Sequence, residues 1–405
     1  MARPASLRES VGPANDPLPH ARRVSASRRA AVLTAVLLAA WSTTVAGAHA
    51  TAWFRARRLA SPQPRTGLVP RALLLRPLAG AEPALRACLA RTGGVPIAVF
   101  CVGSSDDAAH PIAIAAAREL AGTGVQASVT CTAARGPNHK VDQLAIALDR
   151  HPEPCDVVVV CDSDVRLDAA SLQAALLRFQ DPALGMVWFA PVATSSRSCG
   201  DRCAQAVLSG SLHSFPLLAG IDPRGVVGKL LLVRRSALDP IGGFASLRHH
   251  LGEDMELGLR VRAAGWRIER AEVPVRAVGR AVSFVDAVER FARWITVIRT
   301  QRPGLLWSYP LILGASTPAL VTTSLAAWRW PMLVMPAAFL LLARMLVWQR
   351  ARAYARSPIA LSAFLFDVVV SDLVLWLAFV RALGSRPLRW RGRDLVFGPA
   401  RRLQG

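Results

Sequence analysis

The stretch Val157-Val-Val-Val-Cys-Asp162-Ser163-Asp164 is the most informative part of the sequence. Five consecutive apolar residues are typical of a buried strand. Two carboxylates follow at spacing i, i+2, which places both on one face of an extended chain. Two hard oxygen ligands suit Mg²⁺ or Mn²⁺ bridging a diphosphate. A solvated turn at the strand end, where Asp and Ser are common, is the simpler alternative.

Around this stretch, residues 67–300 alternate short apolar runs with stretches of helical spacing. The strand-like runs include Pro96–Val102 and Gln126–Cys131, and the helical ones include His110–Leu120 and Val141–Leu148. Such alternation predicts an α/β domain with a mostly parallel sheet. Ligands of such sheets bind at the carboxyl ends of the strands, which is where Asp162 and Asp164 lie.

Membrane segments are expected on both sides of this domain. Residues 1–29 resemble a disordered basic tail, and residues 30–54 carry no charge and are long enough to cross a bilayer. A secretory signal is the alternative, since Ala46-Gly47-Ala48 resembles a cleavage site. Residues 55–66 form a basic linker.

Residues 305–383 should supply the C-terminal membrane helices. The apolar runs are Leu311–Trp328, Pro331–Trp348 and Ser357–Val380. Arg344 lies near the end of the second run, where a long side chain can reach the interface. Asp367 and Asp372 interrupt the third, which therefore should face the bundle interior or lie partly in the interface. Residues 384–405 are a basic tail, and the charges flanking the loops do not fix the topology.

The chain of 405 residues carries 49 Lys and Arg against 27 Asp and Glu, a net charge of +22. A nucleic-acid partner is one explanation. Because the basic residues crowd beside apolar runs, attraction to a bilayer surface explains the charge more simply, and no nucleic-acid partner is expected. The seven cysteines form no framework, which suits reduced thiols facing the cytoplasm. Cys199 and Cys203 lack a second pair that would complete a zinc site.

Two further clusters could carry chemistry. Glu253 and Asp254 stand at the start of a helical stretch, where a carboxylate is either a helix cap or a general base. Arg290, Arg293 and Trp294 follow at helical spacing, so the two arginines share a face. They could grip phosphate oxygens, or the helix could be an interfacial anchor.

Together and in this order, the motifs resemble those of the ceramide glucosyltransferases and the bacterial hopanoid glycosyltransferases, within the family 2 and family 21 glycosyltransferases. The resemblance runs from about Leu73 to Arg299. Its motifs are Leu75-Arg-Pro-Leu-Ala-Gly-Ala-Glu-Pro83, Val102-Gly-Ser-Ser-Asp-Asp107, Asn138-His-Lys140, Cys161-Asp162-Ser163-Asp164, Ile241-Gly-Gly-Phe244 with Glu253-Asp254, and Arg290-Phe-Ala-Arg-Trp294.

The resemblance implies a GT-A type domain and a role for each motif. Asp107 and Lys140 would bind the nucleotide-sugar donor, and Asp162 would do so through a metal that it shares with Asp164. Asp254 would be the catalytic base. The signature residues Arg290, Arg293 and Trp294 would hold the diphosphate and the acceptor entrance.

Several residues depart from the family pattern. Arg76 stands where the opening motif has Lys, and Ser104-Ser105 where relatives are more polar or acidic. Lys229 stands in Gly228-Lys229-Leu230, where relatives tend to carry small residues. No His follows Val273-Pro-Val-Arg276. These departures bear on the acceptor more than on the type of reaction.

The sequence thus predicts an inverting transfer of hexose or N-acetylhexosamine from a UDP-sugar to a hydroxyl of a membrane lipid, either ceramide-like or hopanoid-like. The protein should be integral to a bacterial inner membrane, with its catalytic domain in the cytoplasm and Mg²⁺ or Mn²⁺ as cofactor. A processive polysaccharide synthase shares these motifs and is the alternative. A catalytically inactive membrane scaffold is a second one.

Overall fold

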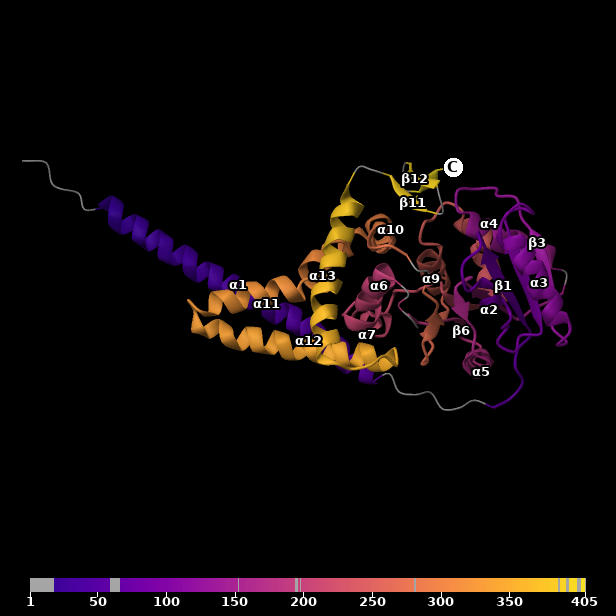
Figure 1. The fold of residues 1–405 in the computed structure, drawn as a ribbon, viewed down its shortest axis with the longest axis horizontal. Helices are drawn as coiled ribbons and strands as arrows, with labels where there is room; N and C mark the ends of the chain where they lie inside the picture. Colours follow the sequence, from indigo (N-terminus) through magenta and orange to yellow (C-terminus); the bar gives the residue numbers. More distant parts are fainter. Residues whose placement is uncertain are drawn as a thin grey trace, which may run out of the picture.

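The computed structural model of the chain describes residues 18–58, 66–151, 153–193, 196, 198–279, 282–384, 387–390, 393–398 and 402–404. A seven-stranded sheet forms the centre of one half of the molecule, and long apolar helices extend from the other half (Figure 1). A third group of helices lies between the sheet and the long apolar helices and packs against both.

The sheet has the strand order β3-β2-β1-β4-β8-β6-β9. The strands are β1 (Ala72–Leu78), β2 (Ile97–Val102), β3 (Gln126–Cys131), β4 (Val157–Cys161), β6 (Leu184–Trp188), β8 (Leu230–Arg234) and β9 (Arg267–Arg270). Strands β3, β2, β1 and β4 are parallel, as are β6 and β9, whereas β8 runs antiparallel to both β4 and β6. The expected mixed α/β class with a mostly parallel sheet, as in the GT-A type, is confirmed.

Helices cover both faces of the sheet because side chains alternate along its strands. In β1, Leu74 and Leu78 pack with α2 (Leu85–Leu89), α3 (Ala109–Ala121) and α5 (Ala169–Leu177). Leu73 and Leu75 pack on the other face with α4 (His139–Arg150), η3 (Phe244–Leu247) and α9 (Glu253–Ala263). A small sheet of β5 (Val165–Arg166), β10 (Val275–Ala277) and β7 (Pro191–Ala193) continues from the edge where β4 ends.

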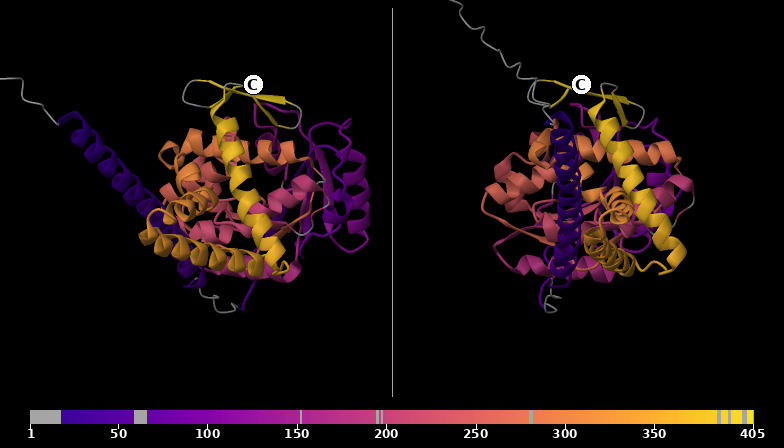
Figure 2. Two further views of the ribbon diagram at one scale, coloured as in Figure 1. Left: turned by 60° about the vertical axis from the view of Figure 1, so that its left-hand side comes forward. Right: turned by 90° about the vertical axis from the view of Figure 1, so that its left-hand side faces the viewer.

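Among the described residues, three helices are long and apolar enough to cross a membrane: 28–56 within α1 (Leu18–Arg58), 331–354 with α12 (Val334–Tyr354), and α13 (Leu361–Leu383). A fourth span is formed if the bent pair of 303–313 and α11 (Ser316–Ala327) counts as one; its two parts meet at 46°. Helix α1 begins at Leu18, inside the stretch expected to be a tail. It lies beside α11 and α12 (Figure 2), and α13 packs against α11.

Charged residues inside the span bundle are paired, as expected for the third apolar run. Asp367 is fully buried, and its carboxylate contacts Arg352 and accepts from Arg202 Nη1 at 2.8 Å and Trp348 Nε1 at 2.9 Å. The expectation that Arg344 reaches the membrane interface is wrong. Its side chain is 1% exposed and is held inside the bundle by hydrogen bonds from Nε and Nη2 to serine hydroxyls on neighbouring helices, although Nη1 has no hydrogen-bond partner among the described residues.

Between sheet and spans lie α6 (Cys199–Gly210), α7 (Phe215–Ile221) and α10 (Phe284–Gln301). Their apolar faces share one core with α1, α12 and α13, including Val207, Phe291 and Val374. The α/β domain and the candidate spans are therefore packed together rather than joined only by a linker.

The remaining elements are short. They are α8 (Arg235–Leu238), β11 (Leu388–Trp390), β12 (Arg393–Phe397), β13 (Leu403–Gln404), and the single turns η1 (Arg178–Gln180), η2 (Asp239–Ile241), η4 (Pro303–Leu305), η5 (Tyr309–Leu313) and η6 (Pro331–Leu333). Strands β11 to β13 form a small antiparallel sheet in the region expected to be a basic tail. Leu403 N donates to His249 O at 2.9 Å, which attaches this sheet to the catalytic-type domain.

Candidate functional site

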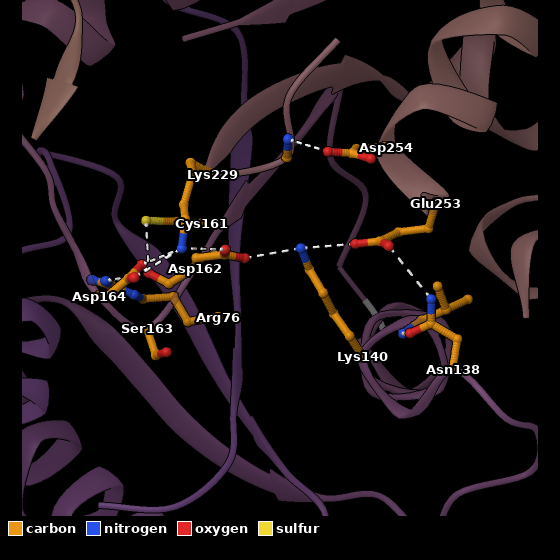
Figure 3. Close-up of polar contacts among 12 residues, drawn as sticks. Arg76, Asn138, Lys140, Cys161, Asp162, Ser163, Asp164, Lys229, Glu253 and Asp254 are labelled. Atoms are coloured by element: carbon orange, nitrogen blue, oxygen red, sulfur yellow. Dashed lines mark hydrogen bonds and ion pairs between the residues drawn. The ribbon is translucent and has the colours of Figure 1, made fainter. Parts of the chain in front are cut away.

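The two carboxylates after β4 face the end of β8. Because β8 is antiparallel to β4, Lys229 lies opposite Asp162, and Asp162 N donates to Lys229 O at 3.0 Å. The Lys229 ammonium lies 3.0 Å from Asp162 Oδ2 and 2.8 Å from both carboxylate oxygens of Asp164. Both aspartates therefore share one cation (Figure 3).

Arg76 fixes the backbone that carries these aspartates. Its fully buried guanidinium donates to Asp162 O at 3.0 Å, Val165 O at 2.7 Å and Cys88 O at 2.6 Å. Such charge-assisted hydrogen bonds to main-chain carbonyls hold the loop after β4 in one shape. The residue that departs from the family's Lys thus has a structural role beneath the site.

A second lysine links Asp162 to the helix start at Glu253. Lys140 Nζ lies 2.9 Å from Asp162 Oδ1 and 2.9 Å from Glu253 Oε1. Burial favours the neutral carboxyl, but the ammonium groups of Lys140 and Lys229 outweigh it and hold the pKa of Asp162 well below its usual range. Asn138 caps α4, which begins with Lys140 in its first turn, and Asn138 Nδ2 also donates to Glu253 Oε2 at 3.4 Å.

Asp254 points away from this ion-pair chain (Figure 3). Its carboxylate accepts from Gly228 N at 2.6 Å and from Met255 N at 2.8 Å. Burial and the neighbouring charge of Glu253 raise the pKa of Asp254 to about 6. A carboxylate with this pKa is largely ionised at neutral pH and can still take a proton, which suits a general base.

Asp107 closes the loop after β2. Its Oδ1 accepts from Gly80 N at 2.7 Å and from Ala109 N at 2.9 Å. The side chain therefore ties the loop after β1 to the beginning of α3, at the carboxyl end of two neighbouring parallel strands.

Helix α10 carries the arginine signature. A capping box of Ser283 and Asp286 starts the helix. The Arg290 guanidinium lies over the Trp294 ring, 5.0 Å from its centroid. Trp294 packs against Phe291 and Phe215, with centroid distances of 5.2 and 5.5 Å. Aromatic packing therefore fixes the face of α10 that carries the arginines.

All of the predicted site residues line one cavity of 2110 Å³: Asp107, Lys140, Asp162, Asp164, Asp254, Arg290, Arg293 and Trp294. Charged residues from the carboxyl edge of the sheet form one part of its wall. Apolar residues of α6, α7 and α10, including Leu208, Phe215 and Leu218, form another. The cavity can therefore hold a polar ligand beside an apolar one.

The donor set fits a divalent metal poorly. Asp162 and Asp164 are the predicted ligands, yet their carboxylates pair with the Lys229 ammonium. Within the described part of the chain, no group of three or more His, Cys, Asp and Glu side chains converges as a metal site. Cys199 and Cys203 belong to no such group either, and every cysteine is a free thiol. The metal remains a prediction.

Lys229 belongs to the site, although the sequence marks it only as a departure from the family pattern. Its neighbour Gly228 was also missed, although its backbone N–H contacts the candidate base. Nothing local marks either residue, because their place depends on the pairing of β8 with β4.

Comparison with known proteins gives one family match. The chain matches the model of the family described as Glycosyl transferase family 21 over residues 32–402. No curated protein matches the chain.

Solved structures similar to the chain include two nucleotide-sugar complexes. The mannosyltransferase PcManGT from Pyrobaculum calidifontis, in complex with GDP-Man and Mn²⁺, is 19% identical. The match covers 85% of this chain and 99% of that chain, with a TM-score of 0.47. S. aureus TarS residues 1–349 in complex with UDP-GlcNAc is 12% identical, covering 83% and 99% of the respective chains, with a TM-score of 0.37.

Proposed function

The chain belongs to glycosyl transferase family 21, and from this premise we propose that it transfers a hexose or N-acetylhexosamine from a UDP-sugar to a lipid hydroxyl, with inversion. The acceptor is ceramide-like or hopanoid-like. The observation that carries the proposal is the single cavity, whose wall joins the carboxylates and basic residues of the sheet edge to apolar residues of helices packed on the membrane spans.

The reaction is one displacement. The acceptor hydroxyl oxygen forms a bond to the anomeric carbon as the bond from that carbon to the β-phosphate oxygen breaks. Asp254 takes the hydroxyl proton, and the nucleoside diphosphate leaves with the electron pair of the broken bond. Two main-chain N–H groups hold Asp254, so the base is positioned before the substrates arrive.

Positive charge is needed where the diphosphate leaves. Arg290 and Arg293 line the cavity and would bind its oxygens. The carboxylates of Asp162 and Asp164, the expected ligands of Mg²⁺ or Mn²⁺, pair with the Lys229 ammonium, so the proposed displacement is written without a metal. Asp107 and Lys140 would bind the nucleotide side of the donor.

The membrane helices would bring the acceptor from the bilayer to the apolar wall of the cavity. Helix α7 packs against α1 and α12, so this wall is continuous with the candidate spans. Nucleotide-sugars and reduced thiols belong to the cytoplasm, so the domain would face the cytoplasm from a bacterial inner membrane.

Incubation of membranes containing the protein with radiolabelled UDP-glucose or UDP-N-acetylglucosamine and total lipid tests this function. Label that partitions into organic solvent, and that is lost in the Asp254→Asn variant, supports the proposal. Label in precipitated polymer would indicate a processive synthase instead. Absence of any label with either donor would indicate a scaffold.

A further inference from the structure

Both the side-chain contacts and the backbone pairing of Lys229 place its ammonium between the carboxylates of Asp162 and Asp164. Its ammonium contacts three carboxylate oxygens of Asp162 and Asp164 at 2.8 to 3.0 Å. The side chains are largely shielded, with exposed fractions of 14% for Lys229 and 8% for Asp164. The pairing of β8 with β4 sets the backbone of Lys229 opposite Asp162. The contact is therefore built into the sheet rather than made by a mobile surface side chain.

The use of lysine in this chain also points to the site. Of 49 basic residues, only Lys140 and Lys229 are lysine, and the other 47 are arginine. Both lysines contact Asp162, one on each carboxylate oxygen. An ammonium is a compact point charge, whereas a guanidinium is a broad planar fork. Both lysines of the chain therefore lie at this one site, where each contacts two carboxylates.

A divalent ion would have to compete with this ammonium. The ion would need the same oxygens of Asp162 and Asp164 that Lys229 already contacts. If the divalent ion displaced the Lys229 ammonium from these oxygens, two cations would lie side by side in a poorly solvated part of the cavity wall. Their repulsion is electrostatically unfavourable. The described residues offer no third His, Cys, Asp or Glu ligand in compensation.

We propose that the ammonium of Lys229 is the resident cation of the diphosphate site, taking the place of a divalent metal, so that the donor binds and reacts without one. The inference rests on the proposed function for the identity of the ligand. Two of the three ammonium N–H groups can serve the two carboxylates, which leaves one for a phosphate oxygen of a donor in the cavity that Lys229 lines. Lys229 thereby stabilises the charge that develops on the leaving diphosphate.

The lysine content provides a direct spectroscopic test. Protein labelled with [¹⁵N]lysine should give two backbone amide signals, one each from Lys140 and Lys229, and Lys140→Arg assigns them. UDP added in the presence of EDTA should shift the Lys229 signal. Mn²⁺ added in EDTA-free buffer should leave that signal sharp. Paramagnetic broadening of the Lys229 signal by stoichiometric Mn²⁺, or a UDP shift that requires Mn²⁺, would overturn the proposal.

A matched pair of variants tests the competition by calorimetry. Lys229→Met keeps an apolar stem of similar length without the charge, and should bind Mn²⁺ roughly tenfold or more tightly than the unmodified protein does. Adding Asp164→Asn should remove that gain. If Lys229→Met unfolds, Lys229→Gln replaces it, with thermal unfolding as the check. Equal Mn²⁺ affinity of the unmodified protein and the folded variant would show that Lys229 does not compete with a divalent ion, which would contradict the proposal.

Mn²⁺ binding is measured without any donor or acceptor. Failure of sugar transfer would therefore contradict the proposed function and leave this result standing. Conversely, transfer activity that is lost in EDTA and restored by Mn²⁺ would support the proposed function. It would contradict the proposal that Lys229 serves as the cation in place of a metal.

Discussion

At the scale of single residues, we expect turnover to depend most on Asp254, the proposed base. Asp254→Asn preserves the shape of the side chain but cannot take a proton, so kcat should fall by about 10²–10⁴-fold. Binding of UDP should stay nearly unchanged, because the residues proposed for the nucleotide lie elsewhere in the cavity. Calorimetric titration with UDP and a lipid-transfer assay measure the two quantities separately.

Glu253→Gln is the control for this change. Glu253 contacts Lys140 and Asn138 rather than the Gly228 loop. The Glu253→Gln substitution should therefore weaken UDP binding more than it lowers kcat. An active Asp254→Asn enzyme beside an inactive Glu253→Gln enzyme would reverse the assignment of the base.

If Asp254 is the base, the pH dependence of kcat/KM follows from its raised pKa in the ligand-free protein. The base acts as a carboxylate, so activity should be full above its pKa, which burial and Glu253 raise to about 6, and should fall as the pH drops below that value. A pH series of initial rates at substrate concentrations well below KM measures this limb. An acidic limb that persists unchanged in Asp254→Asn would assign it to another group.

Gly228 should be intolerant of a side chain for a reason specific to the site. A Cβ on Gly228 would lie 2.9 Å from Asp254 Cβ and 3.0 Å from Asp254 Oδ2. Gly228→Ala should therefore displace the base and lower kcat with little loss of UDP binding. Gly225→Ala in the same loop is the matched control, since its Cβ would approach nothing closer than 3.6 Å. Equal activity of the two variants would contradict the assigned position of Asp254.

At the scale of elements, α10 connects the cavity to the membrane spans. If Arg293 grips the diphosphate, Arg293→Lys should still lower kcat/KM, because a point charge does not reproduce a planar fork. A charge-assisted hydrogen bond contributes about 1.5–3 kcal/mol, so a loss of roughly tenfold or more is expected.

Arg299→Lys on the same helix is the control. Arg299 Nη1 donates to Ala382 O at 2.6 Å on α13, and Arg299 is not among the residues that line the cavity. Full activity in Arg293→Lys, with loss of membrane binding in Arg293→Ala, would instead favour the interfacial-anchor alternative.

At the scale of the whole molecule, the first helix is part of the bundle. Val45 and Ala46 are buried against α11 and α12, and Ser42 Oγ bonds Thr323 Oγ1 at 2.6 Å. Cleavage of a signal after Ala48 would remove these contacts. The intact mass of the purified protein should therefore include residues 30–54, and a mature chain starting between His49 and Thr51 would contradict membrane anchoring by this helix.

The sequence by itself determined the elements and the order of the motifs, because both are local. The five apolar residues before Asp162 form β4 from side-chain pattern alone, and the uncharged 30–54 lies within a helix for the same reason. Asp107, Asp162 and Asp164 then line one cavity, since the parallel strands that they follow bring their carboxyl ends to one edge of the sheet.

Tertiary structure alone decided which charges meet in the cavity and among the candidate spans. Lys229 lies 65 residues beyond Asp164 and reaches it only because antiparallel β8 pairs with β4, and no local pattern specifies that neighbour. Likewise, Arg344 is buried rather than at the interface because Ser316 and Ser371 come from other helices. An ionised side chain is placed by the partners that compensate its desolvation, and those partners are distant in the chain.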